Sequence, residues 1–306
     1  MASILNEYRQ HAGNPEMVTA EQIDVTYANL TNCDTATDVV IIEHAEEPIG
    51  YVRVSWEELE NGSRDYVLFS PLRTNHVQVT LFTALVAGQE SHLRSLAGDA
   101  SNARLRASAP HPGPGLAATG EAAWLESLDY RSIRFGASLL RPDLENIPDL
   151  PLPDGVEVRP VTPEMLRSIF DAHWEAFRGD WDFTEMAEGD YQQFLDDPLR
   201  DESMWKIAWF GDTVVGQVKS FVNAEENAEM GYLRGYTEYI STHADWRNKG
   251  IAGSLLASSL RELKSRGMTE AALGADTENP GGAFQLYTKM GFELRSYEAA
   301  YAKPMS

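Results

Sequence analysis

The sequence predicts an α+β protein that contains two tandem copies of one fold. Two observations support this prediction: a proline-rich segment in the middle of the chain, and the same order of strands and helices on both sides of it. The segment DLENIPDLPLPDG, residues 143–155, has the composition of a linker. We therefore expect a first domain of residues 1–150 and a second of residues 151–306, each with its own core.

Strong local signals mark the elements of the second copy. Thr162 followed by Pro163 predicts a helix start after a strand at residues 156–162. The pair Gly211-Asp212, between two runs of aromatic and β-branched residues, predicts a hairpin. The other elements that we expect are helices at residues 164–177 and 184–197, a strand at 231–242, a helix at 253–267, a strand at 271–276, a helix through 284–291 and a strand near 296–302.

The first copy repeats this order. Residues 38–44 and 51–56 correspond to the hairpin, and residues 65–73 correspond to the long strand that follows it. Residues 77–96 correspond to the next helix, and residues 123–135 to the late helix and strand. The agreement in order predicts that the two halves share a fold.

The turn WRNKGIAGSLL in the second copy predicts an anion site. At a helix start the first backbone N–H groups have no intrahelical partner, so a turn without bulky side chains can direct them at phosphate oxygens. Arg247 and Lys249 add positive charge there. The small residues of the turn are Gly250, Ala252 and Gly253, and Ser254 adds a hydroxyl group.

The equivalent turn of the first copy reads PLRTNHVQ and has no glycine after Arg73. Thr74, Asn75 and His76 place Cβ atoms where a phosphate needs open backbone amides. We therefore expect the second copy alone to bind an anionic cofactor, and the first copy to have a structural role in shaping the acceptor pocket.

The charge of the chain excludes nucleic acid as a partner. The formal net charge is −22, whereas binding to phosphate backbones needs clustered Lys and Arg. Residues 1–151 and residues 152–306 each carry a formal net charge of −11. Because the acidity is evenly distributed, we interpret it first as a solvated surface. If the charge instead steers a substrate, that substrate is a cation such as an amine.

Composition also limits the compartment and the cofactors. Cys33 is the one cysteine, which excludes a disulfide framework and a cysteine-based zinc site and suits a reducing compartment. We find no apolar run of membrane-spanning length and no signal-peptide pattern in MASILNEYRQHAG. The expectation is a cytoplasmic protein without a bound metal and without a membrane partner.

Four features in order carry a family resemblance: the hairpin, the long strand, the turn WRNKGIAGSLL and the segment NPGGAFQLYTKMGFE. Together they resemble the GCN5-related N-acetyltransferase (GNAT) superfamily, whose members transfer acetyl groups from acetyl-coenzyme A to amines. The resemblance covers residues 156–302, and the tandem layout with one degenerate copy is similar to that of mycothiol synthases. It implies that each copy is a mixed, mostly antiparallel twisted sheet flanked by helices.

The resemblance implies a set of cofactor-binding residues. The pyrophosphate of coenzyme A would lie over the turn, the end of the long strand would offer backbone groups to the pantetheine arm, and Asn279 would lie beside the thioester. One extra residue separates Asn279 from Ala283, which the pair Gly281-Gly282 can absorb. The implied residues are Ile240, Ser241, Thr242, Arg247, Asn248, Lys249, Gly250, Ile251, Ala252, Gly253, Ser254 and Asn279.

Direct acetyl transfer needs a base, an oxyanion donor and an acid. Glu238 is the candidate base, directly or through a water, although the family's glutamate would fall at Tyr236, two residues earlier on the same strand face. The backbone N–H near Ile240 is the expected oxyanion donor, and Tyr287 is the candidate acid. Glu238 as a plain surface residue and Tyr287 as a plain core residue are the alternatives, and His243 or Asp245 are weaker candidates for the base.

The acceptor site is expected near Asp180, Trp181 and Asp182, where charge and a ring face can hold an ammonium, with Tyr236 also near the acceptor. An ordinary polar helix connection is the alternative for the first three residues. The predicted function is acetylation of a primary amine on a small, cationic molecule such as an aminoglycoside-type or peptide antibiotic. The alternatives are acetylation of a cysteinyl pseudodisaccharide, as in mycothiol synthases, and a non-catalytic acetyl-coenzyme A sensor or scaffold.

Overall fold

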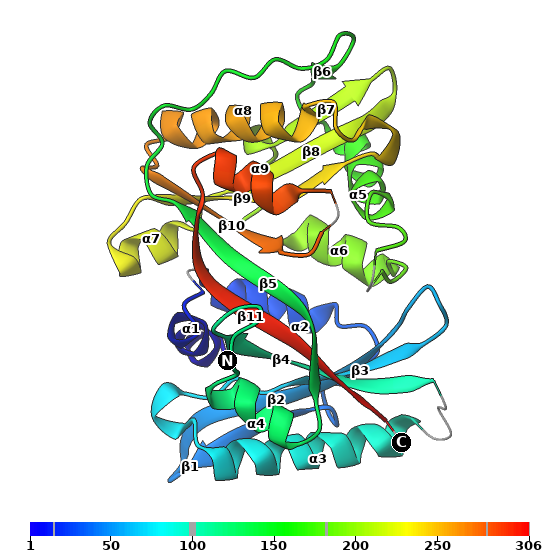
Figure 1. Cartoon of the computed structure of the whole chain (residues 1–306), viewed down its shortest axis with the longest axis vertical. Helices are drawn as coiled ribbons and strands as arrows, with labels where there is room; N and C mark the ends of the chain where they lie inside the picture. Colours follow the sequence, from blue (N-terminus) through cyan, green and yellow to red (C-terminus); the bar gives the residue numbers. More distant parts are fainter. Residues whose placement is uncertain (15, 98–101, 181–182, 280, 306) are drawn as a thin grey trace. The chain divides into compact units, whose positions relative to one another are not determined.

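The computed structural model describes residues 1–14, 16–97, 102–180, 183–279 and 281–305. The chain divides into two compact units (Figure 1). Unit 1 comprises Met1–Ala137, Asp182–Phe194 and Arg295–Ser306, and unit 2 comprises Ser138–Trp181 and Leu195–Leu294. Both units combine a mostly antiparallel sheet with flanking helices, which confirms the α+β class.

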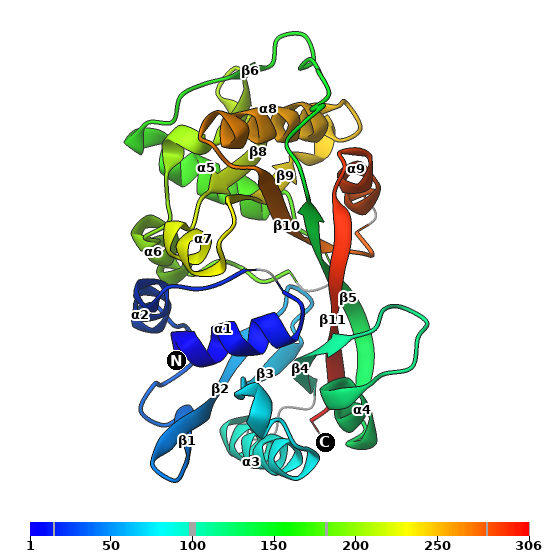
Figure 2. The ribbon, with the colours of Figure 1, turned by 90° about the vertical axis from the view of Figure 1, so that its left-hand side faces the viewer.

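The sheet of unit 1 has the strand order β1-β2-β3-β4-β11. β3 and β4 are parallel, and the other neighbouring pairs are antiparallel. Helices α3 and α4 cover one face of this sheet, and α1 lies on the other (Figure 2). The elements are α1 Ala2–His11, α2 Ala20–Ala28, β1 Val39–His44, β2 Glu47–Glu58, β3 Arg64–Phe69, α3 Val79–Ala97, β4 Ala103–His111, α4 Gly120–Ser127 and β11 Glu293–Pro304.

Alternating residues of the unit 1 strands form its core. Tyr66 and Leu68 of β3 and Leu105 of β4 pack against Phe82 and Leu93 of α3. The C-terminal strand closes the sheet, because β11 pairs with β4 over eight residues, from Tyr297↔His111 to Pro304↔Arg104. The last strand of the second repeat is therefore part of unit 1.

The sheet of unit 2 has the strand order β10-β9-β8-β7-β6, with the last residues of β5 beside β10. β6 to β9 pair antiparallel, and β9 and β10 are parallel. The elements are β6 Glu157–Val158, α5 Leu166–Glu175, β7 Lys206–Phe210, β8 Thr213–Phe221, α7 Ala224–Met230, β9 Arg234–Thr242, α8 Ile251–Ser265, β10 Glu270–Asp276 and α9 Ala283–Lys289. Two further elements are divided between the units: β5 Arg131–Arg141 belongs to unit 1 up to Ala137, and α6 Glu188–Asp196 belongs to unit 1 up to Phe194.

Two helices pack on opposite faces of the unit 2 sheet. A Cβ at Gly216 would lie 2.5 Å from the Ile251 side chain, so α8 approaches β8 at a position where a larger residue would clash. The next side chain points to the other face, and there the amide of Gln217 donates a hydrogen bond to the Ile169 carbonyl of α5 at 3.0 Å. The site described below is built on the α5 face and at the end of β9.

The predicted linker contains no helix or strand, and it packs along α8. Arg261 donates to the Pro148 carbonyl at 2.7 Å, and Lys264 forms an ion pair with Glu145 at 2.8 Å. The compact units exchange segments, so their division is not a single cut and does not test the repeat boundary at residues 150 and 151. That boundary stays a prediction.

Several predicted elements have different bounds in the structure. β6 has two residues where seven were expected, because only Glu157 and Val158 pair with β7. The long strand begins at Arg234, since α7 and its left-handed C-cap Gly231 precede it. In the described ranges, no helix is long and apolar enough to cross a bilayer.

Candidate functional site

A β-bulge interrupts β9 at Tyr239. The β8–β9 ladder shifts register between Gln217 and Lys219, so that β9 has two residues, Tyr239 and Ile240, where β8 has one. Tyr239 has a φ of 51°, a left-handed conformation that costs a bulky residue about 1–3 kcal/mol. Bulges redirect backbone groups away from the ladder. The expected oxyanion donor, the N–H near Ile240, lies in this bulge.

β9 and β10 are joined by a side chain beyond their parallel pairing. The pairing runs from Arg234↔Glu270 to Tyr236↔Ala272. Further along, the Gly274 N–H donates to Oε1 of Glu238 at 2.8 Å. The carboxylate of the candidate base therefore spans the two strands next to the bulge.

The turn before α8 leaves the helix start open. Gly250 is the N-cap with a φ of 84°, no side chain caps the helix, and a Cβ built at Gly250 meets no atom within 4 Å. Asn248 is also left-handed, with a φ of 61°. The Ser254 N–H makes a helical bond to the Gly250 carbonyl at 3.0 Å, so the N–H groups of Ile251, Ala252 and Gly253 precede it. This geometry fits an anionic group held by backbone amides.

Two cations flank this open helix start. The Arg247 guanidinium donates to the Ala176 carbonyl at the end of α5, and Lys249 Nζ lies 4.5 Å from the ring centroid of Trp246. Ile251 and Ser254 are buried, so Ile251 offers its backbone N–H rather than its side chain. Ser241 is also buried near the end of β9, while Ile240 and Thr242 are partly exposed.

Tyr287 lies on α9 and is buried, with 5% of its surface exposed. Burial, and next the negative charge of Glu238, raise the pKa of Tyr287, so the hydroxyl stays protonated at neutral pH. The structure therefore brings the candidate acid and the candidate base within electrostatic range. Asn279 Oδ1 accepts a hydrogen bond from the Gly281 N–H at 2.8 Å, and Gly282 begins α9 with a φ of 73°.

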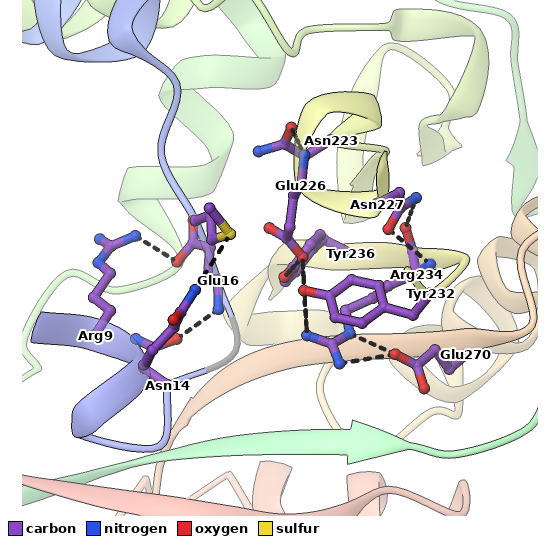
Figure 3. A network of polar contacts seen from close by, with 12 residues as sticks. Arg9, Asn14, Glu16, Asn223, Glu226, Asn227, Tyr232, Arg234, Tyr236 and Glu270 are labelled. Carbon is purple, nitrogen blue, oxygen red and sulfur yellow. Dashed lines mark hydrogen bonds and ion pairs between the residues drawn. The ribbon is translucent and has the colours of Figure 1, made fainter. Parts of the chain in front are cut away.

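Tyr236 belongs to a buried hydrogen-bond network around Glu226 (Figure 3). The hydroxyl groups of Tyr236 and Tyr232 both donate to Oε1 of Glu226 at 2.6 Å, and Arg234 donates to the Tyr232 hydroxyl at 3.1 Å. Burial, and next the Glu226 charge, raise the pKa of Tyr236. The hydroxyl at the position of the family's glutamate is thus bound to a carboxylate from α7.

Sequence analysis missed Glu226 because α7 was not predicted. A local signal was present: Asn223 followed three residues later by a glutamate is the pattern of a helix start. In the structure the Asn223 side chain accepts a hydrogen bond from the Glu226 N–H at 3.0 Å.

The remaining predicted residues have other surroundings. Asp180 is half-buried after α5, and its N–H donates to the Phe177 carbonyl at 2.9 Å. Trp181 and Asp182 lie outside the described residues. His243 Nδ1 accepts from the Asp245 N–H at 3.3 Å, so both alternative bases form a turn cap. No group of three or more His, Cys, Asp or Glu side chains is arranged to hold a metal in the ranges that the structure describes.

The equivalent turn of unit 1 contains an internal anion. The carboxylate of Glu7, on α1, accepts the Thr74 N–H at 2.8 Å and the Thr74 hydroxyl at 2.9 Å, and it pairs with Arg73 at 2.7 Å. Burial raises the pKa of Glu7, but the hydrogen bonds from Thr74 and Arg73 outweigh it and leave the pKa below its ordinary value.

Comparisons with known proteins agree with these features. Residues 166–292 match the family model described as the acetyltransferase (GNAT) family. A search of curated proteins finds no match.

Solved structures share the fold over the whole chain. A GCN5-related N-acetyltransferase from Sphaerobacter thermophilus has a TM-score of 0.70 at 20% identity, and the match covers 99% of this chain and 91% of that chain. A tandem GNAT protein from the clavulanic acid biosynthesis pathway has a TM-score of 0.67 at 11% identity, with 100% and 94% covered. A fungal GCN5-related glucosamine N-acetyltransferase region has a TM-score of 0.64 at 13% identity, covering 98% of this chain and 36% of that chain.

Proposed function

We propose that unit 2, in which residues 166–292 match the family model described as the acetyltransferase (GNAT) family, transfers the acetyl group of acetyl-coenzyme A directly to a primary amine of a small molecule. The observation that carries the proposal is the bulge at Tyr239, which lies on the same strand as Glu238 and leads into the open turn at Gly250. A strained bulge beside an open helix start suits a substrate that carries both a thioester and a pyrophosphate.

The open turn would hold the pyrophosphate. In this proposal the N–H groups of Ile251, Ala252 and Gly253 bind its oxygens, and Arg247 and Lys249 supply charge. Asn248 contributes through its backbone, and Ser254 contributes its hydroxyl group. Ile240, Ser241 and Thr242 pair with the pantetheine arm, and Asn279 lies beside the thioester.

The reaction needs no covalent enzyme intermediate. The neutral amine attacks the thioester carbonyl, the new C–N bond forms, and the C–S bond breaks. The backbone N–H near Ile240 donates to the oxyanion, and Glu238 receives a proton from the amine. Tyr287 donates its hydroxyl proton to the leaving sulfur, which departs as the free thiol, and the proton that Glu238 received restores the tyrosine hydroxyl.

The acceptor is proposed to be a cationic amine, such as an aminoglycoside-type or peptide antibiotic. A net charge of −22 suits such a substrate. The cysteinyl pseudodisaccharide remains the second candidate, and Tyr236 in place of the family's glutamate counts against it. The printed name of the fungal structural neighbour, glucosamine N-acetyltransferase, adds amino sugars to the panel worth testing. A chain with one cysteine suits a cytoplasmic enzyme.

The test is free-thiol release from acetyl-coenzyme A with a panel of amines: aminoglycosides, polyamines, amino acids, glucosamine and cysteinyl glucosaminides. We expect release with one class and none with the Gly250→Val variant. Calorimetry on the same sample measures cofactor binding. Binding without release from any amine would favour the sensor or scaffold instead.

A further inference from the structure

Two basic side chains are buried next to the bulge. Lys219 of β8 is 4% exposed, and His173 of α5 is 6% exposed. Both contact the ring of Tyr239: Lys219 Nζ lies 4.9 Å from its centroid, and the His173 ring lies 5.3 Å from it. One basic side chain from β8 and one from α5 therefore lie against the ring of the bulge residue.

The position of Lys219 relates it to the acetyl-transfer chemistry. Lys219 is the cross-strand partner of Glu238, so their side chains share the face that α5 covers. A second aromatic ring, that of Trp205, lies 5.4 Å from Nζ. Tyr239, which lies over Lys219, is itself 45% exposed. The ring of Tyr239 therefore contacts both Lys219 and solvent.

His173 has an unsatisfied nitrogen. Its Nδ1 is buried and has no hydrogen-bond partner among the residues that the structure describes. Its ring contacts Trp174 and Phe177, at 5.2 and 5.1 Å between centroids. A buried polar atom without a partner is rare and calls for a water or a ligand atom.

We propose that Lys219, together with His173, accepts the first proton that the acceptor ammonium loses, directly or through one water, before Glu238 accepts the second. The proposal rests on the proposed acetyl transfer and adds a base to it. The acceptor ammonium gives one proton to the neutral Lys219 amine, the resulting neutral amine attacks the thioester, and its second proton leaves with the sulfur. Lys219 then returns its proton to solvent.

The electrostatics of the pair support this role. Burial lowers the pKa of Lys219 to about 7, and burial, and next the Lys219 charge, hold the pKa of His173 well below its ordinary value. The pair therefore holds at most one proton near neutral pH. The titratable groups next to Lys219 include Glu238 and Tyr239 from β9 and His173 from α5. A base that titrates near the working pH is better matched to an amine than an ordinary carboxylate is.

The first experiment measures kcat/KM against pH for Lys219→Met and Lys219→Arg. Methionine has a similar length and suits the apolar surroundings, and arginine keeps the charge but cannot lose it. We expect both to lower kcat/KM at pH 7 about 100-fold with cofactor affinity unchanged. The rate of the wild type should level off above pH 7, whereas that of the variants should keep rising. The matched control is Lys206→Met. It removes a β7 lysine that forms an ion pair with Glu262 of α8, and it should leave the pH profile unchanged.

An unchanged pH profile in Lys219→Met, with thiol release intact, would overturn this assignment and leave the proposed function standing. Failure of the wild type to release thiol with any amine would overturn the proposed function and this assignment with it.

A second measurement does not need turnover. The chain contains six lysines, so a ¹³C-lysine NMR spectrum contains few signals. The Lys219 signal is the one that is missing from the spectrum of Lys219→Arg. We expect it to titrate near pH 7. Titration near pH 10, as in unfolded chains, would refute the assignment even for an active enzyme.

Discussion

Residues 64–97 of unit 1 and residues 234–265 of unit 2 are two versions of one strand–turn–helix unit. In unit 2 the strand carries the bulge at Tyr239, and the helix begins at the left-handed Gly250. Both turns contain a short 3-10 helix, Thr74–His76 in unit 1 and Ala244–Trp246 in unit 2, but in unit 1 the β2–β3 register runs without a shift and the turn before α3 has no left-handed residue. The same topology therefore supports either an open helix start or a closed one, depending on a few residues.

In the unit 1 turn, a carboxylate of the same chain accepts the hydrogen bonds. Glu7 gives its carboxylate to the Thr74 N–H and to Arg73, so a backbone N–H group and a cation of this turn are already occupied. A carboxylate supplied by the chain needs no ligand and is always present at the turn. The comparison teaches that a lost anion site can be replaced by an internal anion.

The helices before the last strand of each repeat show the same relation. Aligning WLESLDY of unit 1 with LYTKMGF of unit 2 places Asp129 at Gly291, and both are left-handed, with φ of 69° and 83°. The same alignment places Leu125, fully buried in the unit 1 core, at Tyr287. Unit 1 therefore keeps the left-handed backbone at the helix end but lacks the hydroxyl group that Tyr287 provides in unit 2.

The largest expected effect comes from closing the open turn. In Gly250→Val, a β-branched residue must adopt a φ of 84° and place methyl groups over the backbone amides. We expect cofactor affinity to fall by at least about 100-fold, or about 2.7 kcal/mol, measured by calorimetry. Asn75→Ala in unit 1 is the control and should leave affinity intact. If Asn75→Ala lost the cofactor instead, the active repeat would be misassigned.

Next in size is removal of the hydroxyl that unit 1 lacks. Tyr287→Phe keeps the buried ring and deletes the donor to sulfur. We expect kcat to fall about 100-fold with cofactor affinity within about twofold, from steady-state kinetics and calorimetry. Equal losses in both would mean that Tyr287 supports binding only.

A buried acid in unit 1 gives a smaller, pH-dependent effect. Glu121, at the start of α4, has its pKa raised by burial to about 7 from 4.5. The folded state therefore binds the proton more tightly, and stability falls as pH rises from about 4.5 to about 7. Glu121→Gln should be more stable than the parent by about 2 kcal/mol at pH 8, and the difference should shrink by about that amount at pH 4.5. Urea unfolding at both pH values checks this.

The control for Glu121 is Glu126→Gln, an exposed position on the same helix. It should show no such change with pH. A pH-independent difference for Glu121→Gln would indicate a packing effect rather than a raised pKa.

The smallest expected effect comes from weakening the internal anion. Glu7→Gln keeps an acceptor for the Thr74 N–H and removes the charge that pairs with Arg73. Because both side chains are about one-third exposed, we expect a loss of about 1 kcal/mol in unfolding free energy and no change in cofactor affinity. A second cofactor bound per chain, seen in calorimetric stoichiometry, would show that unit 1 keeps a latent site.

Local patterns predicted the elements that depend on neighbouring residues. The hairpin at β7 and β8 follows from Gly211-Asp212, and the helix start at Gly250 follows from a glycine before an apolar run. Glu238 was proposed as the base from its place on the long strand and Tyr287 as the acid from the family resemblance, and the structure brings these two residues within electrostatic range.

Other features depend on contacts that no local pattern encodes. The bulge needs the β8–β9 register, which a single strand does not specify. His173 and Lys219 are far apart in sequence and meet only through the packing of α5 on β8. β4 was not predicted at all, because its buried face consists largely of small residues such as Ala107 and Ala109, which give a weak alternation signal.

The eight-residue pairing of β11 with β4 also concerns how the protein is made. Residues 1–137 leave the ribosome long before residues 295–306 are synthesised. Until then, the edge of β4 that β11 will cover has open hydrogen-bonding groups, and exposed edges invite aggregation. In most tandem proteins the first domain can fold while the second is translated. Here the first repeat cannot finish folding until the last strand of the second repeat has been made. A nascent or truncated chain that lacks its last dozen residues is therefore a candidate for chaperone capture, although it holds the whole sequence of the first repeat.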